Sequence, residues 1–459
     1  MISKLFAVGA SAIALAVASP VLAQDAPAAP AAPAATTSAT PTMSFGDWGF
    51  DPAGLDANVD PGDDFFAFAN GKWLAANPLP PEFSRYGAFT LLDEKSTADV
   101  KTIIDELVAK DPATLTNDEA RIVAAYNAYF DTAAIDASGL ASAKPYLETI
   151  KGADTLGELA TVWGQPGMPS PLGGGVTVDA KEPTRYSVAF GAGGLGLPDR
   201  DNYLKTAERD VEIQTKYREY LAFLLGQAGY ADAADMAQKV YAFEDQIART
   251  VAWDRATRRN RDLTYNALSP AELAALDPAF PLGAYLSASG YDKTDRFIVG
   301  DLPPTESRVT ELALDQATVA KIGGGTPAMM ALLRATPVEV LQAWTVKSFM
   351  DSNAAVLSTA IDEANFAFRG TVLNGTPQQR PRWKRAIGEA ESLIGERVGA
   401  AYAARYFPAE NKAAMEDLVA NLRKAMAISL QENEWMSAAT KKEAMAKLEA
   451  FDPKIGYRD

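Results

Sequence analysis

The sequence predicts a mainly α fold, a large multi-helical domain that carries a small β-hairpin insertion. Apolar residues recur at helical spacing along most of the chain after Phe45. Two short runs of alternating residues, 175–181 and 185–191, break this pattern, and Lys-Glu-Pro-Thr supplies a turn between them. With 459 residues, of which 48% are hydrophobic, the chain can bury a large core.

The first residues have the pattern of a secretory signal peptide. Lys4 precedes an apolar region, and small residues then lead to Ala23. We expect cleavage between Ala23 and Gln24, so that residues 1–23 are removed. The apolar region is short for a membrane span, and we expect none after cleavage. Residues 24–44 are rich in Ala, Pro and Thr, which predicts a linker that forms no core.

The helical segments follow in order. Apolar residues keep helical spacing over residues 100–108 and again over 122–130. Longer patterns over 217–225 and 236–251 predict two long helices with a glycine between them. Near the end of the chain, a capping box is expected to begin a helix at Thr440. Aromatic residues at this spacing are interpreted as core.

A glycine-rich stretch follows the second alternating run. Gly191, Gly193, Gly194 and Gly196 stand in the order G-x-G-x-x-G, which is the dinucleotide fingerprint. That fingerprint requires a strand that leads through the glycines into a helix. Here Pro198 follows at once, and the next residues resemble an irregular turn. We therefore interpret the glycines as the exit from the hairpin and as a close packing site, without a nucleotide.

Composition excludes several kinds of site. The 59 acidic and 43 basic residues give a net charge of −16, which disfavours nucleic acid and anionic lipid as partners. Cysteine and histidine are both absent. The chain therefore has no disulfide or thiolate, and it lacks the commonest general base and the commonest metal ligand.

One acidic segment resembles a calcium-binding loop at first sight. Asp56, Asn58 and Asp60 stand at alternate positions, as in an EF-hand. Pro61 replaces the glycine of that loop, and Ala67 stands where its bidentate Glu belongs. We therefore expect no calcium there. The usual motifs of serine nucleophiles and phosphate loops are also absent from the sequence, so motifs alone identify no catalytic residue.

Four stretches resemble, in the same order, the N-terminal half of the neprilysin and endothelin-converting enzyme family of zinc metallopeptidases. They are residues 59–92, 193–204, 260–273 and 435–459. The first contains VDPGDDFFAFANGKWL, and the second is GGLGLPDRDNYL. The resemblance spans nearly the whole chain after the linker. It implies a helical domain that caps a zinc domain and encloses a chamber for small peptides.

The resemblance also implies what the chain lacks. In that family an H-E-x-x-H helix and a downstream Glu bind zinc, and all of them lie in the C-terminal half. We expect zinc in the complete enzyme, but no metal ligand, catalytic residue or activity in these 459 residues. Residues 45–75 are expected to pack on the catalytic domain and residues 76–430 to form the helical cap. Residues 431–459 would begin the connection to a catalytic half in the same or a separate chain.

One candidate site residue follows from the resemblance. Arg85, in the sequence SRYG, matches the family residue that binds the C-terminal carboxylate of a peptide. A guanidinium can bind a carboxylate through two parallel hydrogen bonds. A second family Arg is replaced here by Asp93, which favours endopeptidase over carboxypeptidase-like cleavage. The alternative for Arg85 is an ion pair within the protein.

Other departures from the family concern stability and location. Gly62, Asn70 and Ala386 stand where secreted animal relatives carry cysteines, so packing would replace disulfides. Together with the signal peptide, this favours export to a bacterial periplasm or secretion. Two functions stay open at this point. One is the cap half of an exported zinc endopeptidase, and the other is a stand-alone helical module that binds peptides or a partner without hydrolysis.

Overall fold

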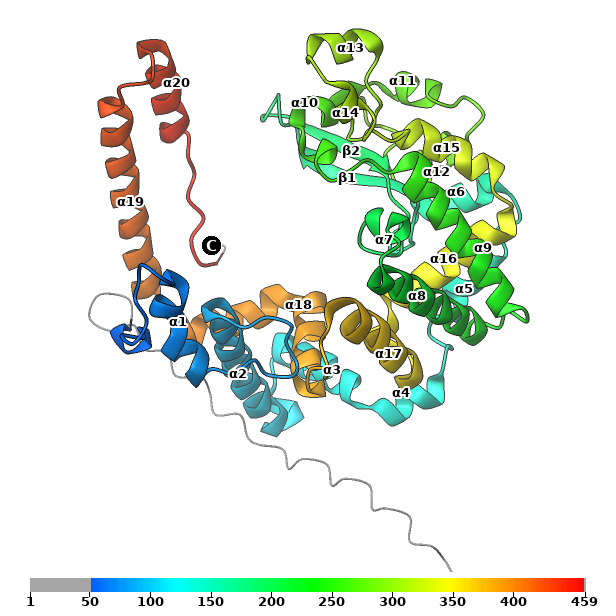
Figure 1. The fold of residues 1–459 in the computed structure, drawn as a ribbon. Helices are drawn as coiled ribbons and strands as arrows, with labels where there is room; N and C mark the ends of the chain where they lie inside the picture. Colours follow the sequence, from blue (N-terminus) through cyan, green and yellow to red (C-terminus); the bar gives the residue numbers. More distant parts are fainter. Residues whose placement is uncertain (1–50, 458–459) are drawn as a thin grey trace, which may run out of the picture. The chain divides into compact units, whose positions relative to one another are not determined.

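Helices form most of the protein over residues 51–457, the part of the chain that the computed structural model describes (Figure 1). The expected signal peptide and linker, residues 1–44, lie outside the described residues. The helices are α1 (Phe65–Ala76), α2 (Ala88–Ala109), α3 (Asn117–Phe130), α4 (Thr132–Ser138), α5 (Lys144–Lys151), α6 (Leu156–Gly164), α7 (Asp201–Leu204), α8 (Glu208–Gln227), α9 (Ala233–Gln246), α10 (Arg261–Thr264), α11 (Pro270–Ala275), α12 (Leu282–Ala288), α13 (Glu306–Glu311), α14 (Gln316–Val319), α15 (Gly325–Ala335), α16 (Val338–Ser352), α17 (Thr359–Asn365), α18 (Arg382–Tyr406), α19 (Ala409–Glu432) and α20 (Ala438–Glu449).

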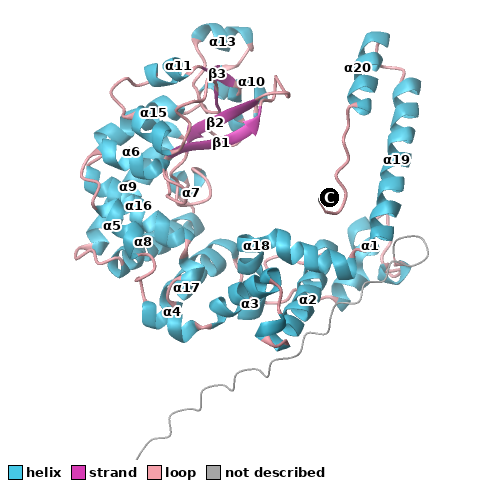
Figure 2. Cartoon of the chain, turned by 180° about the vertical axis from the view of Figure 1, so that it is seen from behind, coloured by secondary structure: helices cyan, strands magenta, loops and turns pink. Residues whose placement is uncertain are grey.

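The predicted hairpin is confirmed, and it belongs to a larger sheet (Figure 2). Strands β1 (Leu172–Val178) and β2 (Tyr186–Ala192) are antiparallel. Within residues 51–457, β3 (Asn266–Leu268) and β4 (Phe297–Val299) complete one mixed sheet in the order β1-β2-β4-β3, with β2 parallel to β4. Because β3 and β4 have three residues each, they are too short for alternation to predict them.

Side chains at the helix N-termini explain where several helices begin. Thr116 and Glu119 form a capping box at α3, and Ser269 and Glu272 form another at α11. The capping box expected at Thr440 is wrong. Helix α20 begins earlier because the Ser437 hydroxyl accepts the Thr440 N–H at 3.1 Å.

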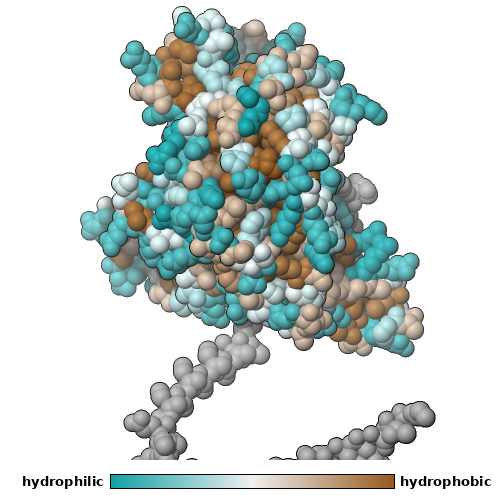
Figure 3. All heavy atoms as spheres, turned by 90° about the vertical axis from the view of Figure 1, so that its right-hand side faces the viewer, coloured by the Kyte–Doolittle hydropathy of each residue, from teal (hydrophilic) through white to brown (hydrophobic). Residues whose placement is uncertain are grey.

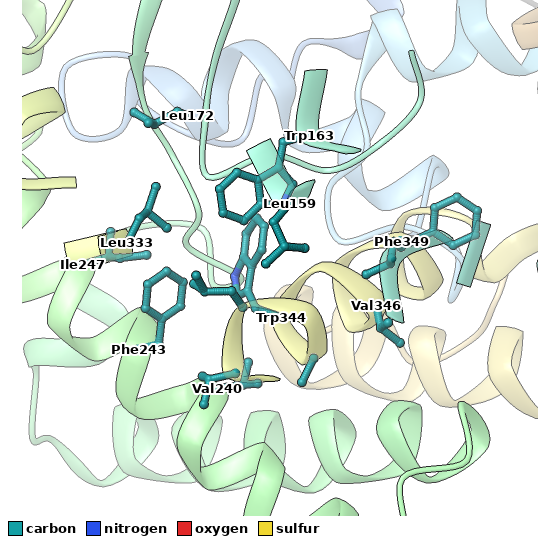
Figure 4. Packing of buried hydrophobic residues seen from close by; sticks show 14 of the residues in the cluster. Leu159, Trp163, Leu172, Val240, Phe243, Ile247, Leu333, Trp344, Val346 and Phe349 are labelled. Atoms are coloured by element: carbon teal, nitrogen blue, oxygen red, sulfur yellow. The ribbon is translucent and has the colours of Figure 1, made fainter. Parts of the chain in front are cut away.

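Among residues 51–457, the larger of two hydrophobic clusters joins α5, α6, α8, α9, α12, α15, α16 and the sheet. Figure 4 shows Trp344 of α16 among Leu159 and Trp163 of α6 and Phe243 of α9. Both indoles also make hydrogen bonds, since Trp344 Nε1 donates to the Gly194 carbonyl at 3.0 Å and Trp163 Nε1 donates to Thr345 Oγ1 at 2.9 Å. The predicted long helices, α8 and α9, supply much of this core.

The second cluster joins α2, α3 and α18. Its buried members are Val100, Ile104, Leu107, Ile122, Tyr126, Tyr129, Ala386, Ile387 and Val398. The helical patterns predicted over residues 100–108 and 122–130 therefore supply this core, except for their last residues, Val108 and Phe130, which are exposed. Ala386, one of the positions without the expected cysteine, is completely buried here, so packing fills that position.

The glycine run has a packing role that the structure explains. It leads from β2 to α7, which has only four residues, so the strand–glycine–helix unit of a dinucleotide site is not formed. The N–H of Gly196 donates to the Tyr203 hydroxyl at 3.1 Å. A Cβ placed on Gly196 would lie 1.7 Å from the Tyr217 hydroxyl oxygen. Only glycine allows this close approach.

Both tyrosines belong to a buried polar network. Glu244 accepts hydrogen bonds from Tyr203 at 2.7 Å and from Tyr217 at 2.8 Å, and it pairs with Lys347 at 2.5 Å. Burial, followed by the charge of Glu244, raises the pKa of both phenols, so they remain hydrogen-bond donors. Because these groups satisfy one another, the network fixes the glycine run against α8, α9 and α16.

The surface shows no sign of a membrane span in the part that is described. Among residues 51–457, no helix has both the length and the apolar character that crossing a bilayer requires. The face in Figure 3 mixes hydrophilic and apolar side chains.

Candidate functional site

The segment that joins α1 to α2 carries Arg85. Three aromatic side chains hold this segment: the Trp73 and Tyr86 rings stack with centroids 6.3 Å apart, and Phe83 lies 5.7 Å from Tyr86. Burial raises the pKa of Tyr86 above its ordinary value. A backbone hydrogen bond of 3.1 Å from Gln378 N to Pro81 O adds a second attachment. The segment is therefore ordered by packing before any ligand binds.

Ion pairs with α18 also hold this segment in place. Lys384 of α18 pairs with Glu82 at 2.5 Å and also with Glu94 of α2. Arg380 contacts Glu94 at 3.0 Å. Both Lys384 and Glu94 are buried. Each has therefore lost hydration, and its ion pairs must offset that cost. The network joins α2, α18 and the loop before α2, which positions the residues that follow Glu82.

Arg85 lies on the exposed side of this segment. It lines a pocket of about 380 Å³ together with Glu82, Phe83, Ser84, Phe89, Thr90, Asp93 and Thr376. Among residues 51–457, its guanidinium has no hydrogen-bond or ion-pair partner. The alternative of an intramolecular ion pair therefore has no support in the described part of the chain. Binding of a peptide carboxylate by Arg85 stays a prediction.

Asp93, at the position of the second family Arg, is itself paired with a cation. Its carboxylate lies 3.4 Å from Arg380, and its side chain is 63% exposed. Since Arg380 also contacts Glu94, one guanidinium is shared between two carboxylates. The pocket thus contains the free cation of Arg85 and a partly compensated anion at Asp93.

Phe89 is a pocket residue that sequence reasoning missed. Its ring is 89% exposed on the first turn of α2. Its position is eleven residues, about three helical turns, before the buried Val100, so spacing alone assigns it to the core face. Its exposure shows that the side of the first turn that carries Phe89 is not covered within residues 51–457, although Leu91 of the same turn is buried.

Two other surfaces are unusually apolar. Every residue of α1 stays at least partly exposed, and Phe65 and Phe66 are 68% and 66% exposed. The same holds for α19 and α20 in the described chain. Exposed apolar side chains occur on α19, between the two helices and after α20: Met415, Leu418, Leu422, Met426 and Ile428, then Trp435, then Phe451 and Tyr457. Apolar patches of this kind mark interaction surfaces.

The described residues do not form a metal centre. Within 51–457, no group of three or more carboxylates is close enough to hold an ion. The carboxylates of the EF-hand-like segment bond locally: Asp56 Oδ1 accepts the Asn58 N–H at 3.1 Å, and Asp60 Oδ1 accepts the Gly62 N–H at 2.7 Å. A zinc ion therefore finds no fitting set of ligands here.

Comparison with known proteins gives a consistent result. The model of the N-terminal part of peptidase family M13 matches residues 61–458. Endothelin-converting enzyme 1 from Bos taurus is 26% identical over 423 residues, which covers 88% of this chain and 52% of that protein. The chain thus spans about half the length of the curated relatives it matches.

Solved structures of a zinc metalloprotease are also similar to this chain. The inhibitor complex of Mycobacterium tuberculosis Zmp1 aligns with a TM-score of 0.74 and 28% identity, over 89% of this chain and 60% of that one. The open state of Zmp1 aligns with a TM-score of 0.67 and 28% identity, over 87% and 60% of the two chains.

Proposed function

Because the chain belongs to peptidase family M13, we propose that it forms the N-terminal, substrate-enclosing part of an exported zinc metalloendopeptidase that cleaves small peptides. The resemblance to the neprilysin and endothelin-converting enzyme family is confirmed, and so is the mainly α fold. The separate roles of the two halves of the complete enzyme, its substrates and its export are part of the proposal.

The observation that carries the proposal is the free guanidinium of Arg85 on an ordered segment. An unpaired Arg at a pocket can bind a peptide carboxylate through two hydrogen bonds. The exposed ring of Phe89 beside it offers an apolar surface for a side chain of the same peptide. Asp93 adds a negative charge to this pocket. It therefore weakens the attraction for a carboxylate, which favours endopeptidase over carboxypeptidase-like cleavage.

The chemistry would come from outside these 459 residues. Since the sequence has no His and no Cys, zinc ligands and the residue that activates water would belong to a C-terminal half in the same or a separate chain. This chain would bind the peptide substrate and would keep folded proteins out of the active site. Arg85 and Phe89 would orient the peptide, and the helical domain, residues 76–430, would limit access to small, flexible substrates.

The exposed apolar surfaces support contact with such a half. Helix α1, most of which lies within the segment 45–75, leaves large apolar side chains uncovered in the described chain. So do helix α19 and the residues around α20 within 431–457. Burial of such surface is worth about 25 cal/mol per Å². We propose that the catalytic half covers both surfaces.

Export is proposed from residues 1–23, and the mature protein would be periplasmic or secreted. The expected first residue is Gln24. N-terminal sequencing of the protein recovered from the envelope or medium tests this. A mature protein that still begins at Met1 contradicts it.

Hydrolysis is the test of the proposed function. The 459-residue chain alone should bind no stoichiometric zinc and cleave no fluorogenic peptide. The same chain joined to, or co-expressed with, the coding sequence that follows Asp459 should gain chelator-sensitive cleavage. If no H-E-x-x-H sequence follows and no cleavage appears, the stand-alone peptide-binding module is the correct function instead.

A further inference from the structure

Strand β1 lies at the edge of the sheet. The strand order β1-β2-β4-β3 leaves one side of β1 without a neighbouring strand among residues 51–457 (Figures 1 and 2). An open edge presents backbone N–H and C=O groups that can pair with another extended chain. What could occupy it depends on which groups face outward and on how they are protected.

The register identifies the outward groups. Gly193 N donates to Pro171 O at 2.8 Å, and Asp179 N donates to Arg185 O at 2.9 Å. Hydrogen-bonded pairs alternate in an antiparallel ladder, so the β1 residues with odd numbers bond to β2. The backbone groups of Gly174, Val176 and Val178 therefore point to the open side.

Neighbouring contacts agree with this assignment. The Tyr291 hydroxyl lies 3.4 Å from the Gly174 carbonyl oxygen, as it can only if that oxygen points away from β2. This contact occupies the outward carbonyl of Gly174, and the Thr177 hydroxyl lies 3.5 Å from the carbonyl oxygen of Val178. Among residues 51–457, the outward N–H groups of Gly174, Val176 and Val178 and the carbonyl of Val176 have no hydrogen-bond partner.

This edge lacks the usual protection. Proteins commonly block an open edge with Lys, Pro, a bulge or an inward charge. Residues 172–178, Leu-Gly-Gly-Gly-Val-Thr-Val, contain no charge and no Pro, and they pair one-to-one with β2 without a bulge. Val176 and Val178 are 64% and 50% exposed, and Tyr186, which pairs with Val178, is 73% exposed. The edge is uncharged, and its large exposed side chains are apolar or aromatic.

One glycine in β1 has no explanation within the fold. A Cβ on Gly174 would lie 1.5 Å from the Ala189 carbonyl oxygen, so the β1–β2 pairing itself requires glycine there. For Gly175, by contrast, the described residues leave more than 4 Å of space around an added Cβ, and its φ lies outside the left-handed region. Glycine weakens a strand and often marks a place where a ligand or another backbone approaches. No contact within the described residues therefore requires glycine at position 175.

We propose that the outer edge of β1 over Gly174–Val178 binds an extended peptide as a fifth strand of the sheet. Main-chain hydrogen bonds would supply affinity for any extended sequence. The exposed Val176, Val178 and Tyr186 would favour apolar side chains at alternate positions of the peptide. The inference rests on the proposed function, since a peptidase of this kind handles short extended peptides.

A peptide fits this edge better than a second copy of the chain does. Five residues span about 17 Å of strand. A stable dimer buries roughly 1,200 Å² or more in total, and such a short edge falls below that. The length matches four or five residues of a peptide, and a second copy is an outcome that the test distinguishes.

The test measures binding to the 459-residue chain without zinc. The probe is a fluorescein-labelled, C-terminally amidated hexapeptide of alternating Val and Thr, and the readout is fluorescence anisotropy. Val176→Pro removes an outward N–H and should raise the Kd at least about tenfold. Val176→Ala keeps the N–H and should change the Kd less than about threefold. Thermal melts establish that the variants fold, and N-methylated forms of the peptide carry the test if Val176→Pro does not fold.

A second arm leaves the protein unchanged. N-methylation of the peptide on one set of alternate residues should abolish binding, and N-methylation on the other set should not, because only one set faces β1. Equal binding by all protein variants, or equal effects of the two N-methylated peptides, overturns the proposal. So does a concentration-dependent dimer in sedimentation that Val176→Pro abolishes.

The design separates this inference from the proposed function. The amidated probe lacks the carboxylate that Arg85 would bind, so Arg85→Ala should leave its Kd unchanged. Edge binding without any peptidase activity in the complemented enzyme contradicts the proposed function alone. Peptidase activity without edge binding contradicts this inference alone.

Discussion

The ammonium group of Lys384 lies 2.5 Å from the carboxylate of Glu82, although the two residues are 302 positions apart in the sequence. Lys384 also pairs with the buried Glu94. Through these two contacts, α18 holds the segment that carries Arg85. The position of the proposed binding residue thus depends on a helix from the other end of the helical region.

Loss of this cation should destabilise the protein strongly. Lys384→Met would leave Glu94 buried with Arg380 as its remaining cation, which should lower the free energy of unfolding by about 3–5 kcal/mol. Urea unfolding followed by circular dichroism measures the change. Lys454→Met is the control, because Lys454 and Asp452 form a pair that is 85% and 80% exposed, and it should have little effect. Equal stability of the two variants would contradict a structural role for Lys384.

The glycine run should tolerate no side chain at Gly196. Gly196→Ala places a Cβ 1.7 Å from the Tyr217 hydroxyl and 2.8 Å from Lys347 Nζ, so the buried network around Glu244 must shift. Overpacking of this kind costs about 1–3 kcal/mol or more. Gly283→Ala is the matched control, since Gly283 lies within helix α12 with open space around its added Cβ. That change should be neutral or stabilising, and a neutral Gly196→Ala would refute the packing explanation.

Acid should remove the contribution of one helix cap. A hydrogen bond from Lys110, and then bonds from Thr116, lower the pKa of Glu119 from 4.5 to about 2. Because the folded-state pKa is below the unfolded one, the stabilisation is fully present above pH 4.5 and is lost as pH falls through about 2. Unfolding midpoints of the wild type and Glu119→Gln should therefore differ at pH 6 and converge toward pH 2. A difference that stays constant over this range would contradict the assignment.

Local patterns in the sequence were sufficient for the helices and the hairpin. The spacing of apolar residues predicted α2, α3, α8 and α9, and alternation predicted β1 and β2, because these elements are long enough for their period to be visible. Strands β3 and β4 are three residues long, and their pairing with β2 depends on contacts distant in sequence. Ser437, and not the predicted Thr440, caps α20. Both residue types can cap a helix, so the sequence alone does not distinguish between them.

The candidate site was predicted only in part. Arg85 was identified through family resemblance, and no pattern of spacing or charge distinguished it from other Arg residues. Phe89 was missed because its exposure depends on what covers α2. The ion pairs of Lys384 with Glu82 and Glu94 were also beyond reach, since they join segments nearly 300 residues apart.

Arg85 is expected to bind the free carboxylate of a peptide substrate. The measurement is kcat/KM of the complete, zinc-loaded enzyme for matched peptides with a free or an amidated C-terminus close to the cleaved bond. Arg85→Ala should lower kcat/KM for the acid forms by about ten- to a hundredfold, equivalent to roughly 1.5–3 kcal/mol, and should change the amide forms little. Arg259→Ala, at another exposed arginine, should change neither. An equal loss for acid and amide peptides would contradict the account and make Arg85 a structural residue.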